Sequence, residues 1–307
     1  MEERSSADAV VLEGVRKSFG EKVAIEELWL RIPAGCICGF LGPNGAGKTT
    51  TIRMIIGIFR PDAGQLRVLG QTDPSLVKHR LGYLPEEKGL YKKMRVRDLI
   101  LYFAQLKGMA ADRARQRANE LLATLDLAEW ADRKCEALSK GMGQKLQILV
   151  SLIHRPELVI LDEPFSGLDP LSRDAMRDLI LELRREGRTV IFSTHVMEQA
   201  EQLCDRVVLI DRGRKLVEGP VEEVRASAGR SVQVEAEGAV AWEQLPGVAG
   251  FSSHGRQADL TLAEGADPQR LLAALVGQAR VRRFEVRATS LHEVFVRAVG
   301  GRRDADL

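Results

Sequence analysis

The chain has 307 residues, of which 45% are hydrophobic and 29% are charged, and its formal net charge is +2. This length favours two domains, and the composition is that of a globular protein rather than a disordered chain. The nearly balanced charge argues against broad, non-specific binding of nucleic acid, which requires a strongly basic face. The sequence contains no apolar run of the roughly 18–20 residues that a membrane span needs, and no secretion signal is expected. The scattered cysteines predict reduced thiols rather than disulfides or a zinc site; they are Cys36, Cys38, Cys135 and Cys204.

The N-terminal part of the chain predicts strands around a glycine-rich loop. Two strand-like runs, VVLEGVRKSF and KVAIEELWLRI, are separated by the turn signal Gly20-Glu21. The apolar run CICGFL (36–41) predicts a strand buried on both faces, as in a parallel sheet. After the glycine-rich loop we expect a helix in TTTIRMIIGIF, followed by a turn at 61–64 and a strand in QLRVLG.

The middle of the chain predicts a helical insert within an α/β core. Residues 89–155 are mostly helical, with Asp112 as the expected N-cap of one helix and another running from near Ser139 to before Pro156. Strand and helix signals then alternate, which predicts a mostly parallel sheet. In chain order these signals are LVILDEP (158–164), SRDAMRDLILELRREG (172–187), TVIFST (189–194) and RVVLID (206–211).

The pattern changes near residues 220–230, where Gly219-Pro220 and a run of small residues predict a domain boundary. The remaining residues, 228–300, predict a small α+β domain, for which we expect split-βαβ topology. Its segment RVRRFEVR (280–287) is basic and would suit nucleic acid or anionic headgroups, but we favour the solvated face of a strand. The domain offers no catalytic motif, and we expect it to stabilise a dimer or regulate activity.

Residues 42–49 read GPNGAGKT and match the phosphate-binding pattern G-x-x-x-x-G-K-[ST]. Glycines at 42, 45 and 47 allow sharp turns that aim backbone N–H groups at phosphate oxygens, and the following helix adds its positive end. Lys48 would place its charge between the β- and γ-phosphates, and the Thr49 hydroxyl would bind Mg²⁺. The motif predicts a nucleoside triphosphate site but specifies the base weakly, although the usual guanine-reading motif is absent from the sequence.

Asp162 and Glu163 follow a buried strand, at the edge where open α/β sheets bind ligands. We expect Asp162 to hold Mg²⁺ through a water molecule, and Glu163 to accept a proton from, or orient, the attacking water. Strand alternation places the two carboxylates on opposite sides. The alternative is a strand-end pair that only caps the next helix.

The motifs GPNGAGKTT, LSKGMGQ, LVILDEP, SGLD and STH occur in this order. Over about residues 8–222 the sequence resembles the ATP-binding cassette (ABC) ATPases, and the LSKGMGQK variant with the α+β tail is similar to export-type members of the NatA sodium-efflux kind. The resemblance implies a P-loop core with an antiparallel β subdomain and a helical insert over 89–155, in a nucleotide-binding domain spanning 1–222. The C-terminal domain resembles the accessory domain of this branch.

The resemblance assigns roles to individual residues. Phe19 matches the aromatic position that stacks on adenine, with packing in the sheet as the alternative. His195 matches a histidine that contacts the γ-phosphate and positions water. Ser139 and Gly141 match the signature segment that closes over a nucleotide bound by the opposite subunit, and Asp169 is either a link between subunits or an N-cap. The implied phosphate loop comprises Gly42, Pro43, Asn44, Gly45, Ala46, Gly47, Lys48, Thr49 and Thr50.

Three positions depart from the usual family pattern. Glu86 stands where a glutamine is expected; its carboxylate is a possible Mg²⁺ ligand, but it also adds negative charge near the phosphates. Lys140 replaces a glycine of the signature segment and either approaches phosphate or faces solvent. Met142 replaces its glutamine.

These observations predict an ATPase that uses ATP and Mg²⁺, with Glu163, His195 and Lys48 as catalytic residues and Thr49, Asp162 and Glu86 at the metal. The resemblance implies two copies facing head to tail, closing on ATP and driving a separate membrane permease, as in an exporter at the cytoplasmic face of the cell membrane. The helical insert should carry the permease contact. The alternatives are a soluble ABC ATPase in translation or DNA maintenance and a purely regulatory cassette. We expect no nucleic-acid partner.

Overall fold

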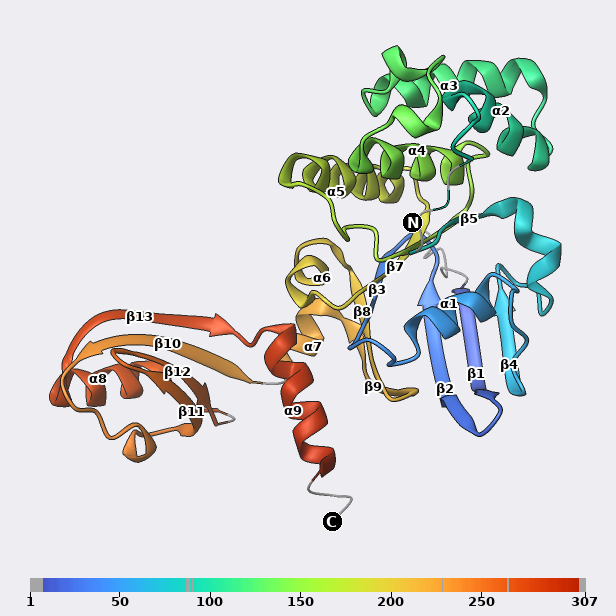
Figure 1. Cartoon of the computed structure of the whole chain (residues 1–307). Coiled ribbons are helices and arrows are strands. Elements are labelled where there is room, and N and C mark those ends of the chain that lie inside the picture. Colours follow the sequence, from blue (N-terminus) through green and yellow to red (C-terminus); the bar gives the residue numbers. More distant parts are fainter. Residues whose placement is uncertain (1–7, 87–88, 90, 228, 264, 304–307) are drawn as a thin grey trace, which may run out of the picture. The chain divides into compact units, whose positions relative to one another are not determined.

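The computed structural model describes residues 8–86, 89, 91–227, 229–263 and 265–303 (Figure 1). The chain divides into two compact units, Met1–Glu218 and Gly219–Leu307. Cys36, Cys38, Cys135 and Cys204 are free thiols. Within the described ranges, no helix has both the length and the apolar character needed to cross a bilayer.

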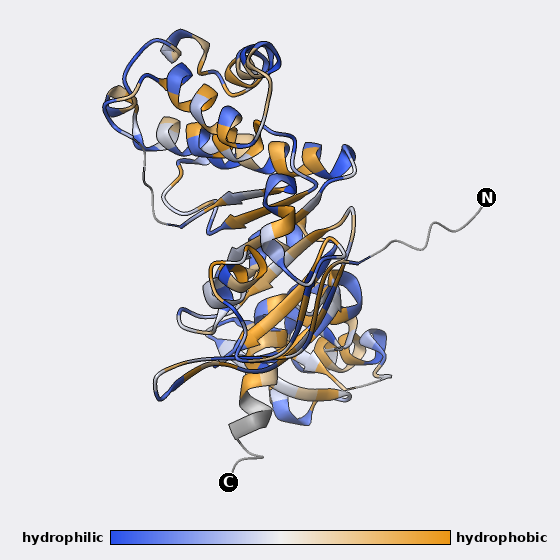
Figure 2. Ribbon diagram, turned by 90° about the vertical axis from the view of Figure 1, so that its right-hand side faces the viewer, coloured by the Kyte–Doolittle hydropathy of each residue, from blue (hydrophilic) through white to orange (hydrophobic). Residues whose placement is uncertain are grey.

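The first unit contains a large sheet whose core pairings are parallel, as expected from the alternating strands and helices. Its strand order is β5 (Leu81–Leu84), β6 (Leu158–Asp162), β7 (Thr189–Thr194), β3 (Ile37–Leu41), β8 (Arg206–Asp211) and β9 (Arg214–Pro220). The pairs β5–β6, β6–β7, β7–β3 and β3–β8 are all parallel. Every residue of β3, β6 and β7 is buried, and Figure 2 colours the central strands of this unit mostly as hydrophobic.

Helices cover both faces of this sheet because successive strand residues point in opposite directions. Helix α1 (Lys48–Ile55) and β3 contribute Ile52 and Phe40 to one apolar cluster. Helix α5 (Pro170–Arg185) contributes Ile180 to a second cluster, which contains Phe192 of β7. Other helical segments of this region are the 3₁₀ turn η1 (Pro74–Arg80) and α6 (Met197–Leu203).

A second, antiparallel sheet has the strand order β2 (Lys22–Pro33), β1 (Asp8–Phe19) and β4 (Ala63–Val68), which confirms the expected antiparallel part. β1 and β2 form a hairpin in which Phe19 pairs with Lys22. The β8–β9 turn lies against this sheet, because the Gly213 carbonyl accepts a hydrogen bond from the Glu26 N–H at 3.1 Å and the Gly213 N–H donates to Ala46 at 2.9 Å.

The helical insert has a core of its own, which includes Leu99, Leu121 and Leu146. Its elements are α2 (Val96–Leu106), α3 (Ala111–Thr124), η2 (Ala128–Trp130), η3 (Cys135–Ala137) and α4 (Lys140–Leu152), and Figure 1 shows α2, α3 and α4 grouped together. The prediction of Asp112 as an N-cap is wrong. Helix α3 begins at Ala111 with Ala110 as N-cap, so Asp112 lies within the first turn and its side chain points into solvent.

The second unit is a four-stranded antiparallel sheet with the order β11-β12-β10-β13, which is the expected split-βαβ arrangement. Val232 of β10, Leu260 of β12 and Leu271 of α8 are fully buried in its core. Its elements are α7 (Val221–Ser227), β10 (Arg230–Glu237), η4 (Trp242–Gln244), β11 (Val248–His254), β12 (Gln257–Leu262), α8 (Pro268–Gln278), β13 (Arg280–Ala288) and α9 (Leu291–Arg303).

The basic strand β13 carries internal charge compensation. Glu285 accepts a hydrogen bond from Arg287 Nε at 2.7 Å and another from Arg283 Nε at 3.0 Å. The bonds from Arg287 and Arg283 lower the pKa of Glu285 to about 2. Arg283 and Arg287 therefore share one carboxylate, which offsets one of their two positive charges.

Candidate active site

The glycine-rich loop joins β3 to α1, and two of its glycines are required by close backbone contacts. Gly42 has a φ of 153°, and a Cβ there would collide with the carbonyl oxygen of Ile210. Gly47 is the N-cap of α1 with a φ of 107°, and a Cβ there would lie 2.9 Å from the carbonyl oxygen of Ala24. The loop is therefore held in the shape that aims its N–H groups inward.

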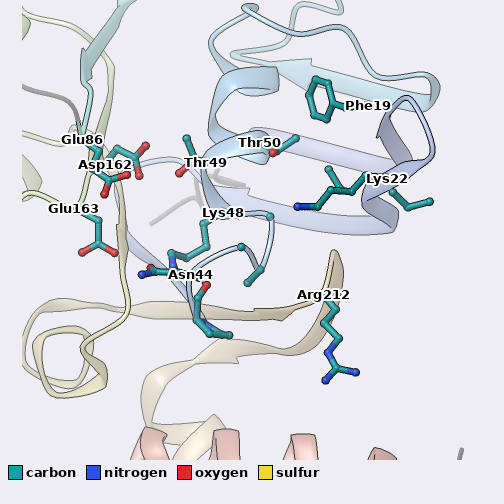
Figure 3. A pocket seen from close by; sticks show the side chains of 16 residues that line it. Phe19, Lys22, Asn44, Lys48, Thr49, Thr50, Glu86, Asp162, Glu163 and Arg212 are labelled. Carbon is teal, nitrogen blue, oxygen red and sulfur yellow. Dashed lines mark hydrogen bonds between the residues drawn. The ribbon is translucent and has the colours of Figure 1, made fainter.

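A cavity of about 500 Å³ opens over this loop. Figure 3 shows Glu86, Asp162 and Glu163 on one wall, Lys48 and Thr49 beside the loop, and Phe19 and Lys22 across from them. The predicted residues that line it are Phe19, Pro43, Asn44, Gly45, Ala46, Gly47, Lys48, Thr49, Thr50, Glu86, Asp162 and Glu163.

Four lining residues were not predicted: Lys22, Val23, Ala24 and Arg212. The first three belong to the β1–β2 hairpin, and Arg212 lies in the β8–β9 turn. Neither segment carries a phosphate-binding pattern, and only the packing of Gly213 against the hairpin and the loop brings the turn to the cavity. The only feature of the sequence that could have indicated a place for Lys22 at the cavity was its closeness to Phe19, a predicted site residue.

Lys48 is buried at the base of the cavity. Its Nζ donates hydrogen bonds to the carbonyl oxygens of Gly42 at 2.7 Å and Pro43 at 3.2 Å. Burial lowers the pKa of Lys48, and the negative charges of Glu163, Asp162 and Glu86 oppose this effect. The ammonium group therefore lies between the phosphate loop and an acidic wall, in a position to bind an anionic ligand.

Asp162 offers an oxygen suited to a metal. Its Oδ1 accepts a hydrogen bond from the Ser193 hydroxyl, whereas its buried Oδ2 has no hydrogen-bond partner within the described part of the chain. Thr49 and Glu86 line the same cavity, so the donor set consists of hard oxygens. The described residues contain no group of three or more His, Cys, Asp or Glu side chains placed to hold a metal. The set fits Mg²⁺ that takes its other ligands from phosphate and water.

Glu163 lies on the same wall of the cavity as Asp162, so the prediction that the two carboxylates point to opposite sides is wrong. The reason is local: β6 ends at Asp162, and Glu163 has a left-handed φ of 50°, so strand alternation no longer applies. The Glu163 N–H donates to Ser193 Oγ at 3.0 Å. Its Oε1 lies 3.0 Å from Nδ1 of His195, whose side chain is 55% exposed.

Phe19 stands at the rim of the cavity with 44% of its surface exposed, rather than packed within the sheet. Its ring meets Phe59 edge to face at 5.1 Å, and Lys17 Nζ lies 5.4 Å from the ring centroid. These contacts orient the ring and leave part of it available for stacking.

Ser139, Gly141 and Asp169 do not line this cavity. Ser139 is the N-cap of α4, and its hydroxyl accepts a hydrogen bond from the Met142 N–H at 3.3 Å. Asp169 is the N-cap of α5 and accepts hydrogen bonds from the N–H and hydroxyl of Ser172 at 3.0 and 2.7 Å. Ser139 and Asp169 therefore both act as N-caps.

The two helix starts adjoin each other. A Cβ at Gly141 would lie 3.3 Å from Ser172 Oγ and 3.5 Å from Asp169 Oδ2. The Lys140 ammonium lies over the turn before α5, where a Cβ at Gly167 would lie 2.7 Å from Lys140 Nζ. Lys140 thus contacts the protein surface instead of extending freely into solvent.

A glycine-rich loop and an acidic strand end that meet at the carboxyl edge of a parallel sheet define a P-loop nucleotide-binding protein. Comparison with known proteins narrows this class to one family. The ABC transporter family profile matches residues 25–166, and the profile of the C-terminal domain of DrrA1-3-like ATP-binding proteins matches residues 219–299. The chain belongs to the ABC transporter ATP-binding proteins, which are ATPases coupled to transport and work with a separate permease.

Several relatives align along nearly their whole length. The chain is 36% identical to the uncharacterized ABC transporter ATP-binding protein YhaQ of Bacillus subtilis, covering 95% of this chain and 98% of YhaQ. It is 36% identical to the Nod factor export ATP-binding protein I of Burkholderia lata, covering 93% and 95%. It is 35% identical to the daunorubicin/doxorubicin resistance ATP-binding protein DrrA of Streptomyces peucetius, covering 95% and 92%.

Solved structures agree with this assignment. An ATP-binding subunit of an ABC transporter is 28% identical with a TM-score of 0.68, and the match covers 72% of this chain and 93% of that one. The cbiO1 protein of Clostridium perfringens, part of the ABC transporter complex cbiONQ, is 25% identical with a TM-score of 0.65, and the match covers 71% and 91%. The chain is a transport ATPase, which disfavours the alternatives in translation and DNA maintenance.

Proposed function

We propose that two copies of this chain close head to tail over ATP and thereby drive an export permease. The observation that carries this proposal is the separation of the signature segment from the nucleotide cavity. Ser139, Gly141 and Asp169 lie together at the starts of α4 and α5, yet none of them lines the cavity above Lys48. A second copy would supply its own Ser139 hydroxyl and the N–H groups at the start of its α4 to the exposed side of the nucleotide.

In this proposal each group of residues in the cavity has its own role. The loop from Gly42 to Thr50 binds the phosphates, and Phe19 stacks on the adenine. Mg²⁺ would be held by Asp162, Thr49 and Glu86, and it would offset phosphate charge. Glu163 accepts a proton from the attacking water, and His195, 3.0 Å from the Glu163 carboxylate, holds that carboxylate in place and contacts the γ-phosphate.

We further propose that the nucleotide-binding domain spans 1–222, with its helical subdomain at about 89–155. The accessory domain, 228–300, would stabilise the dimer or regulate it. Its separate core and the profile match at 219–299 support an independent role.

Substitution of Glu163 by Gln tests the catalytic assignment. Because Gln keeps the size of the side chain but cannot accept the proton, we expect ATP turnover to fall by about 10²–10⁴-fold. ATP binding should persist, and an ATP-dependent dimer should accumulate in light scattering. The matched control is Glu186→Gln at the exposed C-terminal end of α5, which should leave turnover unchanged. Turnover of Glu163→Gln near the wild-type rate would contradict the role of Glu163.

The direction of transport is proposed to be outward, at the cytoplasmic face of the cell membrane. Relatives named for Nod factor export and for daunorubicin/doxorubicin resistance support export. The more specific resemblance to NatA-type sodium-efflux ATPases stays a prediction.

We propose that the permease docks beside the helical insert. A largely apolar cleft of about 270 Å³ there is lined by residues from several elements, including Ile58, Tyr83 and Phe103. Tyr102 lies next to it, 43% exposed, with its ring 5.5 Å from that of Phe103. Leu106, at the end of α2, is 63% exposed. Apolar side chains exposed around a cleft are suited to a partner helix.

A charge placed on the exposed apolar surface at the end of α2, next to Lys107 of the cleft lining, should prevent docking. We expect Leu106→Glu to reduce recovery of the permease from solubilised membranes by about tenfold or more, because the carboxylate would be desolvated at the interface. Val276→Glu, which changes an equally exposed apolar residue of α8, is the control and should recover the permease normally. Equal recovery with both variants would place the permease contact elsewhere.

A further inference from the structure

Gln144 is a buried polar residue of α4 that lies outside the nucleotide cavity. Its side chain is 2% exposed, and its Nε2 donates a hydrogen bond to the carbonyl oxygen of Pro164. A carbonyl oxygen can only accept, so the amide nitrogen is the atom that faces it. Pro164 follows Glu163 directly in the chain. The amide therefore joins α4 to the backbone beside the carboxylate that we assign to the attacking water.

The turn that carries Glu163 is held from several sides. The Glu163 N–H donates to Ser193 Oγ at 3.0 Å, and the Glu163 carbonyl oxygen accepts a hydrogen bond from the Ser166 N–H at 3.1 Å. The buried Phe165 ring packs edge to face on an aromatic ring of β7, with 5.9 Å between the ring centroids. These partners lie in the turn itself or in β7, whereas Gln144 connects the turn to a different element, α4.

Helix α4 packs against two apolar clusters at once. Leu146 and Leu149 belong to the core of the helical insert. Ile148 and Leu152, from the same helix, belong to the cluster that contains Phe165. Because protein interiors are close-packed, a shift of α4 is shared by both clusters. The helix is therefore a mechanical connection between the insert and the segment that follows β6.

We propose that Gln144 is a positioning residue that ties the signature segment of each copy to the Glu163 of the same copy. The inference rests on the proposed function, in which Ser139 contacts the nucleotide of the opposite copy. Ser139 lies five residues before Gln144, roughly 7.5 Å along the helix axis, so a shift of the helix start moves the amide with it. The amide then sets the position of the Pro164 carbonyl and of Glu163 beside it. The nucleotide of one copy thereby aligns the Glu163 of the other, which couples the two sites.

Substitution of Gln144 by Met removes the donor with little change in side-chain size. The buried Pro164 carbonyl loses the amide, so the turn is held less firmly. We expect kcat to fall about tenfold and the KM for ATP to change by less than about twofold, because a misplaced catalytic group slows the chemical step without altering the phosphate loop. Gln144→Asn, whose amide is one methylene too short to reach Pro164, should act in the same direction and replaces the first variant if that one does not fold.

Gln147→Met is the matched control. Gln147 lies in the same helix and is also buried, with 9% of its surface exposed, and its Oε1 has no partner in the described part of the chain. The substitution makes the same chemical change without touching the bond to Pro164. Turnover of Gln147→Met should equal that of the wild type.

Mixed pairs distinguish positioning from a general structural effect. A trace of copies with an intact Glu163 is added to a large excess of Glu163→Gln copies, so that nearly every intact copy pairs with an inactive one. Gln144→Met is introduced either into the intact copy or into the excess copy, and turnover is measured per intact copy. Because we assign the amide to the Glu163 of its own copy, turnover should fall about tenfold only in the first arrangement.

Three results would overturn the inference. An equal loss in both arrangements would mean a structural effect on the pair. A loss only with Gln144→Met in the excess copy would assign the residue to the contact with the opposite nucleotide. Unchanged turnover in both arrangements would exclude a positioning role for Gln144.

The proposed function is checked separately in the same assay. Trace copies without the variant at 144 are too dilute to pair with one another, so adding the excess of Glu163→Gln copies should raise their turnover. If turnover does not respond to the added copies, head-to-tail closure is refuted and the inference falls with it. If turnover does respond, any of the three results above counts against the inference alone.

Discussion

At the scale of single residues, Ser193 organises the acidic end of β6. Its hydroxyl donates to Asp162 and accepts the N–H of Glu163. It occupies this place because β6 and β7 pair in parallel with Asp162 opposite Ser193. One buried hydroxyl thus fixes the orientation of two consecutive residues that we assign to different tasks, the metal and the attacking water.

His154 should make stability depend on pH. Its folded pKa of about 4 lies below the ordinary histidine value of 6.5, so the unfolded ring takes up a proton as pH falls below about 6.5 while the folded ring does not. The free energy of unfolding should therefore decrease between pH 7 and pH 5. Partial exposure of the ring screens the effect, and we expect a loss of about 1–2 kcal/mol.

The measurement is urea unfolding of the wild type and His154→Gln at both pH values. The variant should lose less stability on acidification than the wild type does. If the two proteins lose the same amount, His154 is not the group responsible.

At the scale of elements, the residues at the starts of α4 and α5 cap their helices and also belong to the segment that we propose to contact the nucleotide of the other copy. Ser139→Ala removes the cap of α4 and should lower the free energy of unfolding by about 1 kcal/mol. Ser139→Asp keeps a capping oxygen, so stability should be retained. Its negative charge would nevertheless repel the γ-phosphate of the opposite copy.

We therefore expect Ser139→Asp to fold as the wild type does but to fail to dimerise with ATP in the Glu163→Gln background. Chemical denaturation and light scattering separate the two effects. An ATP-dependent dimer of normal affinity in Ser139→Asp would show that this residue acts only as a cap.

Strands β3, β6, β7 and β8 of the large sheet could be predicted because they are continuous apolar runs ended by glycine or acidic residues, as in CICGFL and LVILDEP, whereas β5 and β9 were not predicted. The phosphate loop could be predicted because its spacing is dictated by backbone geometry. The N-cap of α3 could not, since Ala110 has no capping side chain to signal it. Lys22 and Arg212 were missed because their approach to the cavity depends on packing between segments far apart in the sequence.

At the scale of the whole molecule, each unit has its own buried core. Leu271 is fully buried in the core of the second unit, and Leu149 is fully buried in the helical insert of the first. We expect Leu271→Ala to destabilise the second unit by about 2–5 kcal/mol and to leave ATP turnover unchanged. Hydrogen exchange should accelerate within 219–307 and not within 1–218.

Leu149→Ala is the matched control, because it makes the same truncation in the first unit. It should accelerate exchange within the helical insert and leave 219–307 unaffected. Loss of protection along the entire chain with either variant would mean that the units unfold as one cooperative body.

Glu163 occupies a left-handed backbone conformation, with a φ of 50°. Glycine adopts this conformation without the steric cost that a Cβ imposes, a difference of roughly 1 kcal/mol. Glycine at position 163 would therefore make the protein more stable, but under the proposed role of Glu163 it would abolish catalysis. The carboxylate is kept there at a thermodynamic disadvantage, so a search for thermostable variants of this ATPase would be drawn first to a position that we propose its activity requires.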